Sequence, residues 1–211
     1  MDSRAGGKVA RPTMGGMNTA ATATMTPQAT DAAAALTAAG VSYEEYLTGV
    51  DAVPGIFAVA ADDAAIAQLG LDAVAFEDNL LYVGAAPTSL LGRDVRGHFH
   101  SGRTESSTLR RSLAALLFDE LDLALVPRSP GSRTVKFALT PDAEDRLTAW
   151  MKEHLTVSTV AVDAGDVHAA VGEVVDELEP PLNLKGVAHP WEALIEKRRR
   201  LTAEARPSAT L

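Results

Sequence analysis

The sequence predicts a single α+β domain, built from a small mixed or antiparallel sheet of three to four strands flanked by helices. Three observations lead to this prediction. Two short β-type runs, 56–60 and 79–84, lie near each other in the first half of the chain. Several longer segments carry apolar residues at the 3.6-residue period of a helix. No repeat of 20–50 residues is present, so one layered domain is expected rather than an array.

The first strands are defined by the turns that flank them. Pro54 and Gly55 form a turn before the first β-type run, and Gly84 ends the second. Two such strands predict an antiparallel hairpin with a decorated loop. This part of the chain is predicted to contain a helix over 31–48, a strand over 56–60, a short helix over 62–71, a strand over 79–84 and a helix over 89–99.

The clearest helix of the chain follows residue 107. Ser106 or Ser107 can cap it, and its leucines recur at helical spacing from residue 109 to residue 121. Thr140 and Pro141 can begin a later helix, and Pro180 can end another. The remaining predicted elements are strands over 134–139 and 157–162 and helices over 141–155, 167–178 and 191–206.

Composition limits the class of protein. The chain has 211 residues, of which 46% are hydrophobic, so it can form one core without covalent staples. It contains no cysteine, which excludes disulfides, thiolate zinc sites and a cysteine nucleophile. We expect a cytoplasmic protein and no membrane partner, because the sequence has neither a spanning apolar run nor a secretory signal. The expected organisation is a disordered leader over 1–30, one domain over 31–206 and a tail over 207–211.

The charge distribution predicts a local anion-binding surface. The net charge is −9, which argues against a protein that coats nucleic acid non-specifically. The segment 89–111 nevertheless contains five arginines and only two acidic residues, and a basic patch on an acidic body fits a phosphate groove. A second basic run, at 197–200, is interpreted as a solvated helix end or a phosphate contact.

Three short motifs and one arginine occur in a defined order. Gly55-Ile56-Phe57 comes first and Tyr82-Val83-Gly84 second; Arg93 follows Tyr82 by eleven residues, and a Pro-Pro-Leu-Asn sequence ends at Asn183. This ordered set resembles the GIY-YIG nuclease superfamily, over about residues 53–200. The resemblance implies a GIY-YIG-like fold and an endonuclease that hydrolyses DNA phosphodiester bonds, in repair or restriction.

The resemblance also implies roles for particular residues. Tyr82 corresponds to the tyrosine of the second motif, and Arg93 to an arginine that binds the scissile phosphate. His98 is an auxiliary base or phosphate contact, and Asn183 matches a terminal asparagine that orients the strand end by hydrogen bonds. The cofactor implied is Mg²⁺ or Mn²⁺, held by a helix glutamate, for which Glu173 is the candidate. The predicted nucleic-acid contacts are Arg96, His100, Arg103, Arg110 and Arg111.

The sequence departs from the family pattern at two positions. Phe57 stands where the first motif usually has tyrosine. The metal-binding glutamate should lie twelve residues before Asn183, where the chain has Val171. Glu173 is the nearest carboxylate, but two residues correspond to about 200° around a helix. An alternative hypothesis is therefore a catalytically degenerate module that binds nucleic acid or a protein without cutting.

Overall fold

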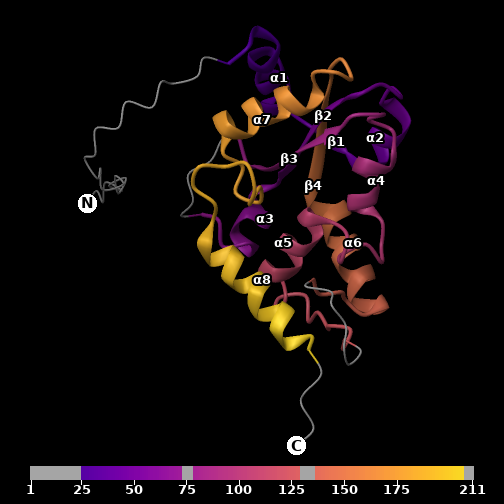
Figure 1. Cartoon of the computed structure of the whole chain (residues 1–211). Helices are drawn as coiled ribbons and strands as arrows, with labels where there is room; N and C mark the ends of the chain where they lie inside the picture. Colours follow the sequence, from indigo (N-terminus) through magenta and orange to yellow (C-terminus); the bar gives the residue numbers. More distant parts are fainter. Residues whose placement is uncertain (1–24, 73–77, 129–135, 207–211) are drawn as a thin grey trace, which may run out of the picture.

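A four-stranded sheet forms the centre of the fold (Figure 1). The computed structural model describes residues 25–72, 78–128 and 136–206. The strand order is β1-β4-β2-β3, and all neighbouring strands are antiparallel. The strands are β1 (Val41–Ser42), β2 (Gly55–Ala61), β3 (Leu80–Ala86) and β4 (Leu155–Ala161). The predicted α+β class is confirmed, and the two β-type runs pair as the predicted hairpin.

The register of β2 and β3 decides which side chains share a face of the sheet. Phe57 lies opposite Gly84, and Val59 lies opposite Tyr82, before an irregularity in the pairing. Directly opposed residues project to the same face, so Phe57 and Tyr82 lie on one side. A Cβ atom at Gly84 would come within 2.4 Å of the Phe57 ring. Glycine is therefore required at position 84 for the ring to lie across the hairpin.

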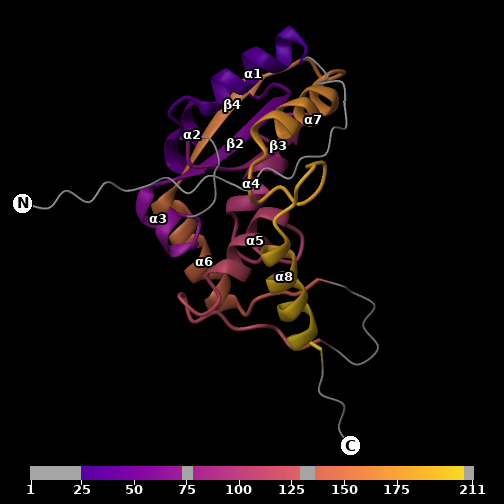
Figure 2. The same cartoon turned by 90° about the vertical axis from the view of Figure 1, so that its left-hand side faces the viewer.

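Two helices cover one face of the sheet. They are α1 (Pro27–Thr37) and α7 (Val167–Leu178), which pack against each other and against the strands (Figure 2). Their apolar residues form a small core with Ile56, Ala58 and Val83. This layer buries alanine and valine side chains, which allows the two helices to approach the sheet closely.

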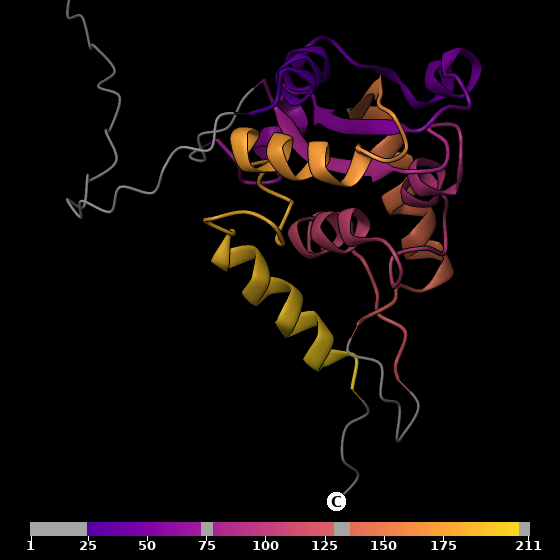
Figure 3. The same ribbon diagram turned by 45° about the horizontal axis from the view of Figure 1, so that its top comes forward.

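The other face carries the larger core, which includes Phe57, Val59 and Leu81. Six helices contribute residues to this core, and α8 lies alongside α5 (Figure 3). The helices whose residues contribute to this core are α2 (Tyr43–Gly49), α3 (Asp63–Gln68), α4 (Arg93–Phe99), α5 (Thr108–Leu116), α6 (Pro141–His154) and α8 (Glu192–Glu204). No helix in the described ranges is long and apolar enough to cross a membrane.

The N-terminal part of the domain differs from the prediction in two ways. The expected helix over 31–48 is interrupted, because Val41 and Ser42 pair with β4 before α2 begins. Ser42 caps α2 through a capping box with Glu45, which explains why a new helix starts there. Residues 27–30, assigned to the leader, belong to α1, where Ala29 is buried. The rest of the expected leader, residues 1–24, lies outside the described residues.

The strand predicted over 134–139 was wrong for its described part. Residues 136–139 form only one isolated bridge, between Leu139 and Leu125. Phe137 and Leu139 are buried and alternate with more exposed neighbours, which is the pattern that predicted a strand. They pack into the larger core without joining the sheet. Residues 134 and 135 lie outside the described residues.

Candidate functional site

Three rings meet on the face of the sheet that carries the larger core. The Tyr82 ring centroid lies 6.1 Å from that of Phe57 and 5.5 Å from that of His98. The centroids of Phe57 and His98 are 5.7 Å apart. The hairpin supplies Tyr82 and Phe57, and α4 supplies His98. The fold therefore brings together two of the predicted site residues that lie 16 positions apart in the sequence.

The phenol of Tyr82 is neutral at physiological pH. Burial raises its pKa above the ordinary value, and the nearby charge of Arg111 opposes this rise only in part. Within the described part of the chain, its hydroxyl has no hydrogen-bond partner. Tyr82 can therefore offer its O–H to a bound ligand without breaking an internal bond.

His98 is held by a residue that also caps a helix. Its Nδ1 lies 2.6 Å from Ser107 Oγ, and the same oxygen accepts the Arg110 N–H at 3.0 Å. Burial lowers the pKa of His98 to about 4, and the positive charge of Arg110 lowers it further. The imidazole is therefore neutral at physiological pH, and its ring orientation is fixed by the first turn of α5.

Asn183 lies in the loop after α7 and contacts the edge of the sheet. Its Oδ1 accepts the Val83 N–H at 2.9 Å, and its Nδ2 donates to the Val83 carbonyl at 2.8 Å. The Leu182 N–H donates to the Leu81 carbonyl at 3.0 Å. The loop thus continues the hydrogen bonding of the edge strand beside Tyr82.

Tyr82 lies between two hollows of the surface and lines both. The first, called here the α4 hollow, is lined by α4 and the loop that follows it; its basic residues are Arg96, His98, His100 and Arg103. The second, called the α8 pocket, lies between α5, α8 and the Asn183 loop; its basic residues are Arg111, Lys136, Lys185, Arg198 and Arg199. No carboxylate is found among the described residues that line either of them. Both hollows are therefore suited to an anionic ligand.

The predicted phosphate ligands are distributed unevenly. Arg93 is the first residue of α4, but its side chain lies outside the described residues. Arg96, His100 and Arg103 are exposed in the α4 hollow. Arg111 is turned toward the α8 pocket. The predicted basic segment is thus divided between the two sides of Tyr82.

Arg110 does not belong to this surface, which corrects its prediction as a nucleic-acid contact. Its side chain is completely buried and forms an ion pair with Glu144 at 2.7 Å. It also donates to the His98 carbonyl and to Thr104 and Thr148. Adjacent residues on a helix point about 100° apart, so Arg110 faces the core while Arg111 faces the pocket.

Glu173 does not lie at the predicted metal site, because α7 covers the face of the sheet opposite to Tyr82 and His98. Its Oε2 accepts hydrogen bonds from the backbone N–H and the hydroxyl of Thr26, at 2.7 and 3.0 Å. Val171, at the family's glutamate position, packs against the small core beneath α1. Glu173 therefore binds Thr26, the N-cap residue of α1, and does not contact Tyr82 or His98.

Comparison with known families shows which family this chain belongs to. The family described as the GIY-YIG catalytic domain matches residues 62–206. The chain belongs to this family. Neither the curated proteins nor the solved structures compared with it gave a match. The matched range contains Tyr82, Arg93, His98 and Asn183, and it begins after the Gly55-Ile56-Phe57 motif.

GIY-YIG nucleases generally use divalent metal ions, but the described residues of this GIY-YIG domain do not fit one. Magnesium prefers oxygen ligands and is commonly held through carboxylates. The described lining of the two hollows is cationic or neutral, and nearby positive charges repel a divalent cation. No group of three metal-ligating side chains occurs among the described residues. The described residues around Tyr82 therefore offer no carboxylate that would hold a divalent ion.

Four cations of the α8 pocket were not predicted as site residues: Lys136, Lys185, Arg198 and Arg199. Arg198 belongs to the basic run at 197–200, and its helical neighbours Arg199 and Arg200 form ion pairs with Glu196 and Glu204. The sequence shows the run but does not show which of its members faces α5. Lys136 and Lys185 stand alone in the sequence and carry no signal of their own.

Proposed function

We propose that this GIY-YIG domain binds DNA across Tyr82 and hydrolyses its phosphodiester bonds as an endonuclease. One observation carries the proposal. The two hollows meet at Tyr82 and their charged described residues are all basic, although the chain has a net charge of −9. Each phosphate of a DNA strand carries a negative charge, so the strand is attracted to such a surface. A role in repair or restriction and a cytoplasmic location stay predictions.

The proposed chemistry uses groups of the chain itself. A guanidinium on α4 holds the scissile phosphate and the charge that develops on it, and Arg93 is the residue assigned to this role by the motif order. The neutral phenol of Tyr82 donates its O–H to a phosphate oxygen. When His98 carries its proton on Nδ1, the Nδ1–H donates to Ser107 Oγ. Nε2 is then unprotonated and can accept a proton from the attacking water. Dependence on Mg²⁺ or Mn²⁺ stays a prediction from the family.

The test is cleavage of supercoiled plasmid, with Mg²⁺, with Mn²⁺ and with a chelator. The wild-type protein is expected to nick the plasmid, and Arg93→Ala and Tyr82→Phe are expected to lose this activity. Arg200→Ala is the control, since Arg200 is exposed and pairs with Glu204 on α8. A wild-type protein that leaves the plasmid intact under all three conditions would contradict the proposed hydrolysis.

A second function, binding of DNA without cleavage, is favoured by two particular observations. Phe57 lacks the hydroxyl that the first motif usually supplies, and its ring is buried against Tyr82 and His98. Glu173, the nearest carboxylate to the family position, lies across the sheet. A salt-dependent gel shift by a protein that never nicks DNA is the result expected for this function.

A further inference from the structure

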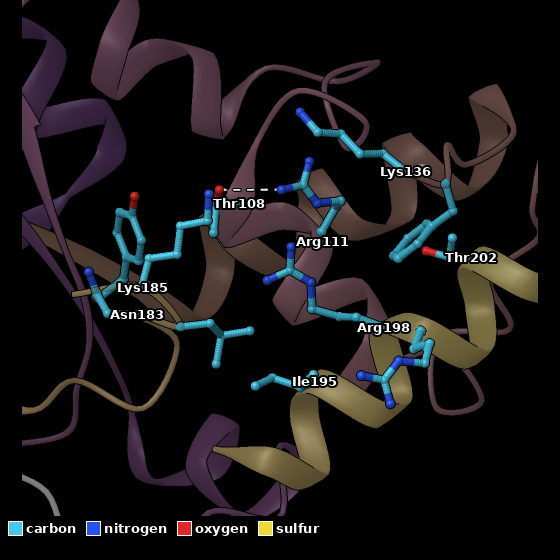
Figure 4. Close-up of a pocket in the computed structure, with 12 residues that line it drawn as sticks. Thr108, Arg111, Lys136, Asn183, Lys185, Ile195, Arg198 and Thr202 are labelled. Carbon is cyan, nitrogen blue, oxygen red and sulfur yellow. Dashed lines mark hydrogen bonds between the residues drawn. The ribbon is translucent and has the colours of Figure 1, made fainter. Parts of the chain in front are cut away.

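The α8 pocket encloses about 690 Å³ and is lined by five basic side chains (Figure 4). Arg111 enters from α5 and Arg198 from α8, and both extend toward the middle of the pocket. Lys136, Lys185 and Arg199 complete the basic lining. This volume lies within the ~300–1,000 Å³ that is typical of sites for small ligands.

Two neighbouring arginines of α5 differ in how their charges are paired. Arg110 is fully buried and has a carboxylate partner, Glu144, at 2.7 Å. Arg111 is only 8% exposed, yet its guanidinium donates only to neutral oxygens, the Glu105 carbonyl at 2.6 Å and the Thr108 hydroxyl at 3.4 Å. Buried charges in proteins are normally paired. The fold gives Arg110 an ion-paired carboxylate. Arg111 has the charge of Glu105 nearby, but it forms no ion pair with a described carboxylate, so a bound anion can pair with it.

Arg198 adds a second partly buried charge to the same place. Its closest described partner is the Ser112 hydroxyl, at 3.4 Å. Burial lowers its pKa to about 10, and the positive charge of Arg111 contributes to the decrease. The two guanidinium groups therefore repel each other in the free protein. An anion bound between them would relieve this repulsion and could accept several hydrogen bonds.

The remaining lining indicates what kind of anion fits. Thr108 and Thr202 supply hydroxyl groups, while Leu184 and Ile195 supply partly exposed apolar surface. A phosphate matches the guanidinium and hydroxyl groups, and the attached sugar or base matches the apolar side. Tyr82 and Asn183 line the same pocket, so a strand that passes Tyr82 can reach it.

We infer that the α8 pocket binds a second phosphate of the nucleic-acid strand, separate from the phosphate that is held beside Tyr82 and His98. The inference rests on the proposed function, because it assumes a nucleic-acid strand at Tyr82. Arg111 and Arg198 hold this phosphate between them, and Lys185 and Lys136 contribute at the rim. The phosphate is either internal to a continuous strand or the terminal phosphate of a strand end.

The test is DNA binding measured by fluorescence anisotropy at several salt concentrations. Oligonucleotides are compared with a 5′-phosphate, with a 3′-phosphate and with hydroxyl ends. Arg198→Ala is expected to weaken binding at least tenfold and to lower the slope of log affinity against log salt by about one. Arg200→Ala, on the exposed side of α8, is expected to change neither quantity. A loss seen with all oligonucleotides identifies an internal phosphate, and a loss confined to one phosphorylated end identifies a terminal one.

One further variant tests the pocket independently of Arg198. Lys185→Ala alters an exposed side chain and tests the pocket if Arg198→Ala does not fold; it is expected to weaken binding severalfold. A folded Arg198→Ala protein with unchanged affinity and salt slope would overturn the inference, and so would a wild-type protein that binds no oligonucleotide. Binding that depends on Arg198 in a protein without nicking activity would support the pocket while contradicting the proposed hydrolysis.

Discussion

Asn183 completes the hydrogen bonding of Val83, a residue 100 positions earlier in the chain, through both ends of its side-chain amide. Because β3 is an edge strand, its outer N–H and C=O groups would otherwise need water or another strand. An asparagine amide offers one acceptor and one donor in the arrangement of a peptide group, which matches both needs. The contact fixes the loop after α7 beside Tyr82 and brings Lys185 to the α8 pocket.

Asn183→Ala is expected to lower the free energy of unfolding by about 1–3 kcal/mol, since it removes both partners of the Val83 peptide. DNA binding should also weaken, because the loop that carries Lys185 loses its attachment to the sheet. Urea unfolding followed by circular dichroism measures the first effect. Lys185→Ala is the matched control in the same loop, and it should leave stability within about 0.5 kcal/mol of the wild type. Equal stability of Asn183→Ala and wild type would contradict the structural role.

Tyr82→Phe distinguishes the role of the Tyr82 ring in packing from the role of its hydroxyl in cleavage. The ring contacts with Phe57 and His98 are kept, and the hydroxyl that is lost has no described hydrogen-bond partner. Stability is therefore expected to change by less than about 0.5 kcal/mol. Under the proposed function, the rate of plasmid nicking falls by roughly 10²-fold or more, the size of effect seen when an electrostatic donor is removed from an active site. Full nicking activity in a folded Tyr82→Phe protein would show that the Tyr82 hydroxyl is not needed for cleavage.

His98 predicts a pH dependence of stability with a defined sign. Its pKa is about 4 in the folded protein and 6.5 in ordinary surroundings. The unfolded chain therefore binds a proton at a higher pH than the folded one, so stability falls as the pH falls from about 6.5 to about 4. The loss attributable to this group is on the order of 2–3 kcal/mol.

The measurement is urea unfolding at several pH values from about 4 to about 7, the range that the pKa shift of His98 defines. His98→Gln should show a shallower loss of stability toward acid than the wild type. His100→Gln is the control, because His100 is exposed two residues away and should leave the wild-type slope unchanged. Parallel curves for wild type and His98→Gln would show that His98 is not buried in its neutral form.

The sequence predicts local features of this fold better than contacts between distant elements. The hairpin was predictable because Pro54, Gly55 and Gly84 mark its strands. The break at Val41 was not, since a two-residue strand depends on β4, which lies more than 110 residues later. The different roles of Arg110 and Arg111 were not predictable either, because the carboxylate that pairs with Arg110 in the core, Glu144, comes from α6. Motif order placed Tyr82 and Asn183 together, but spacing alone could not show which face of the sheet α7 covers.

Val171→Glu tests that last point directly, since it restores a glutamate at the position that the family motif specifies. In the structure this residue packs against the small core between α7 and the sheet, on the side opposite to the Tyr82 ring. The new carboxylate is therefore expected to destabilise the domain by about 1–3 kcal/mol and to add no Mg²⁺-dependent cleavage beyond that of the wild type. Glu173→Gln is the companion variant: it alters the contact with Thr26 and should leave nicking and DNA binding at wild-type levels. Stability is measured by urea unfolding and cleavage by plasmid nicking with and without Mg²⁺. If Val171→Glu gained Mg²⁺-dependent cleavage, α7 would have to present position 171 to the Tyr82 face during catalysis, and the assignment of α7 to the opposite layer would not describe the active protein.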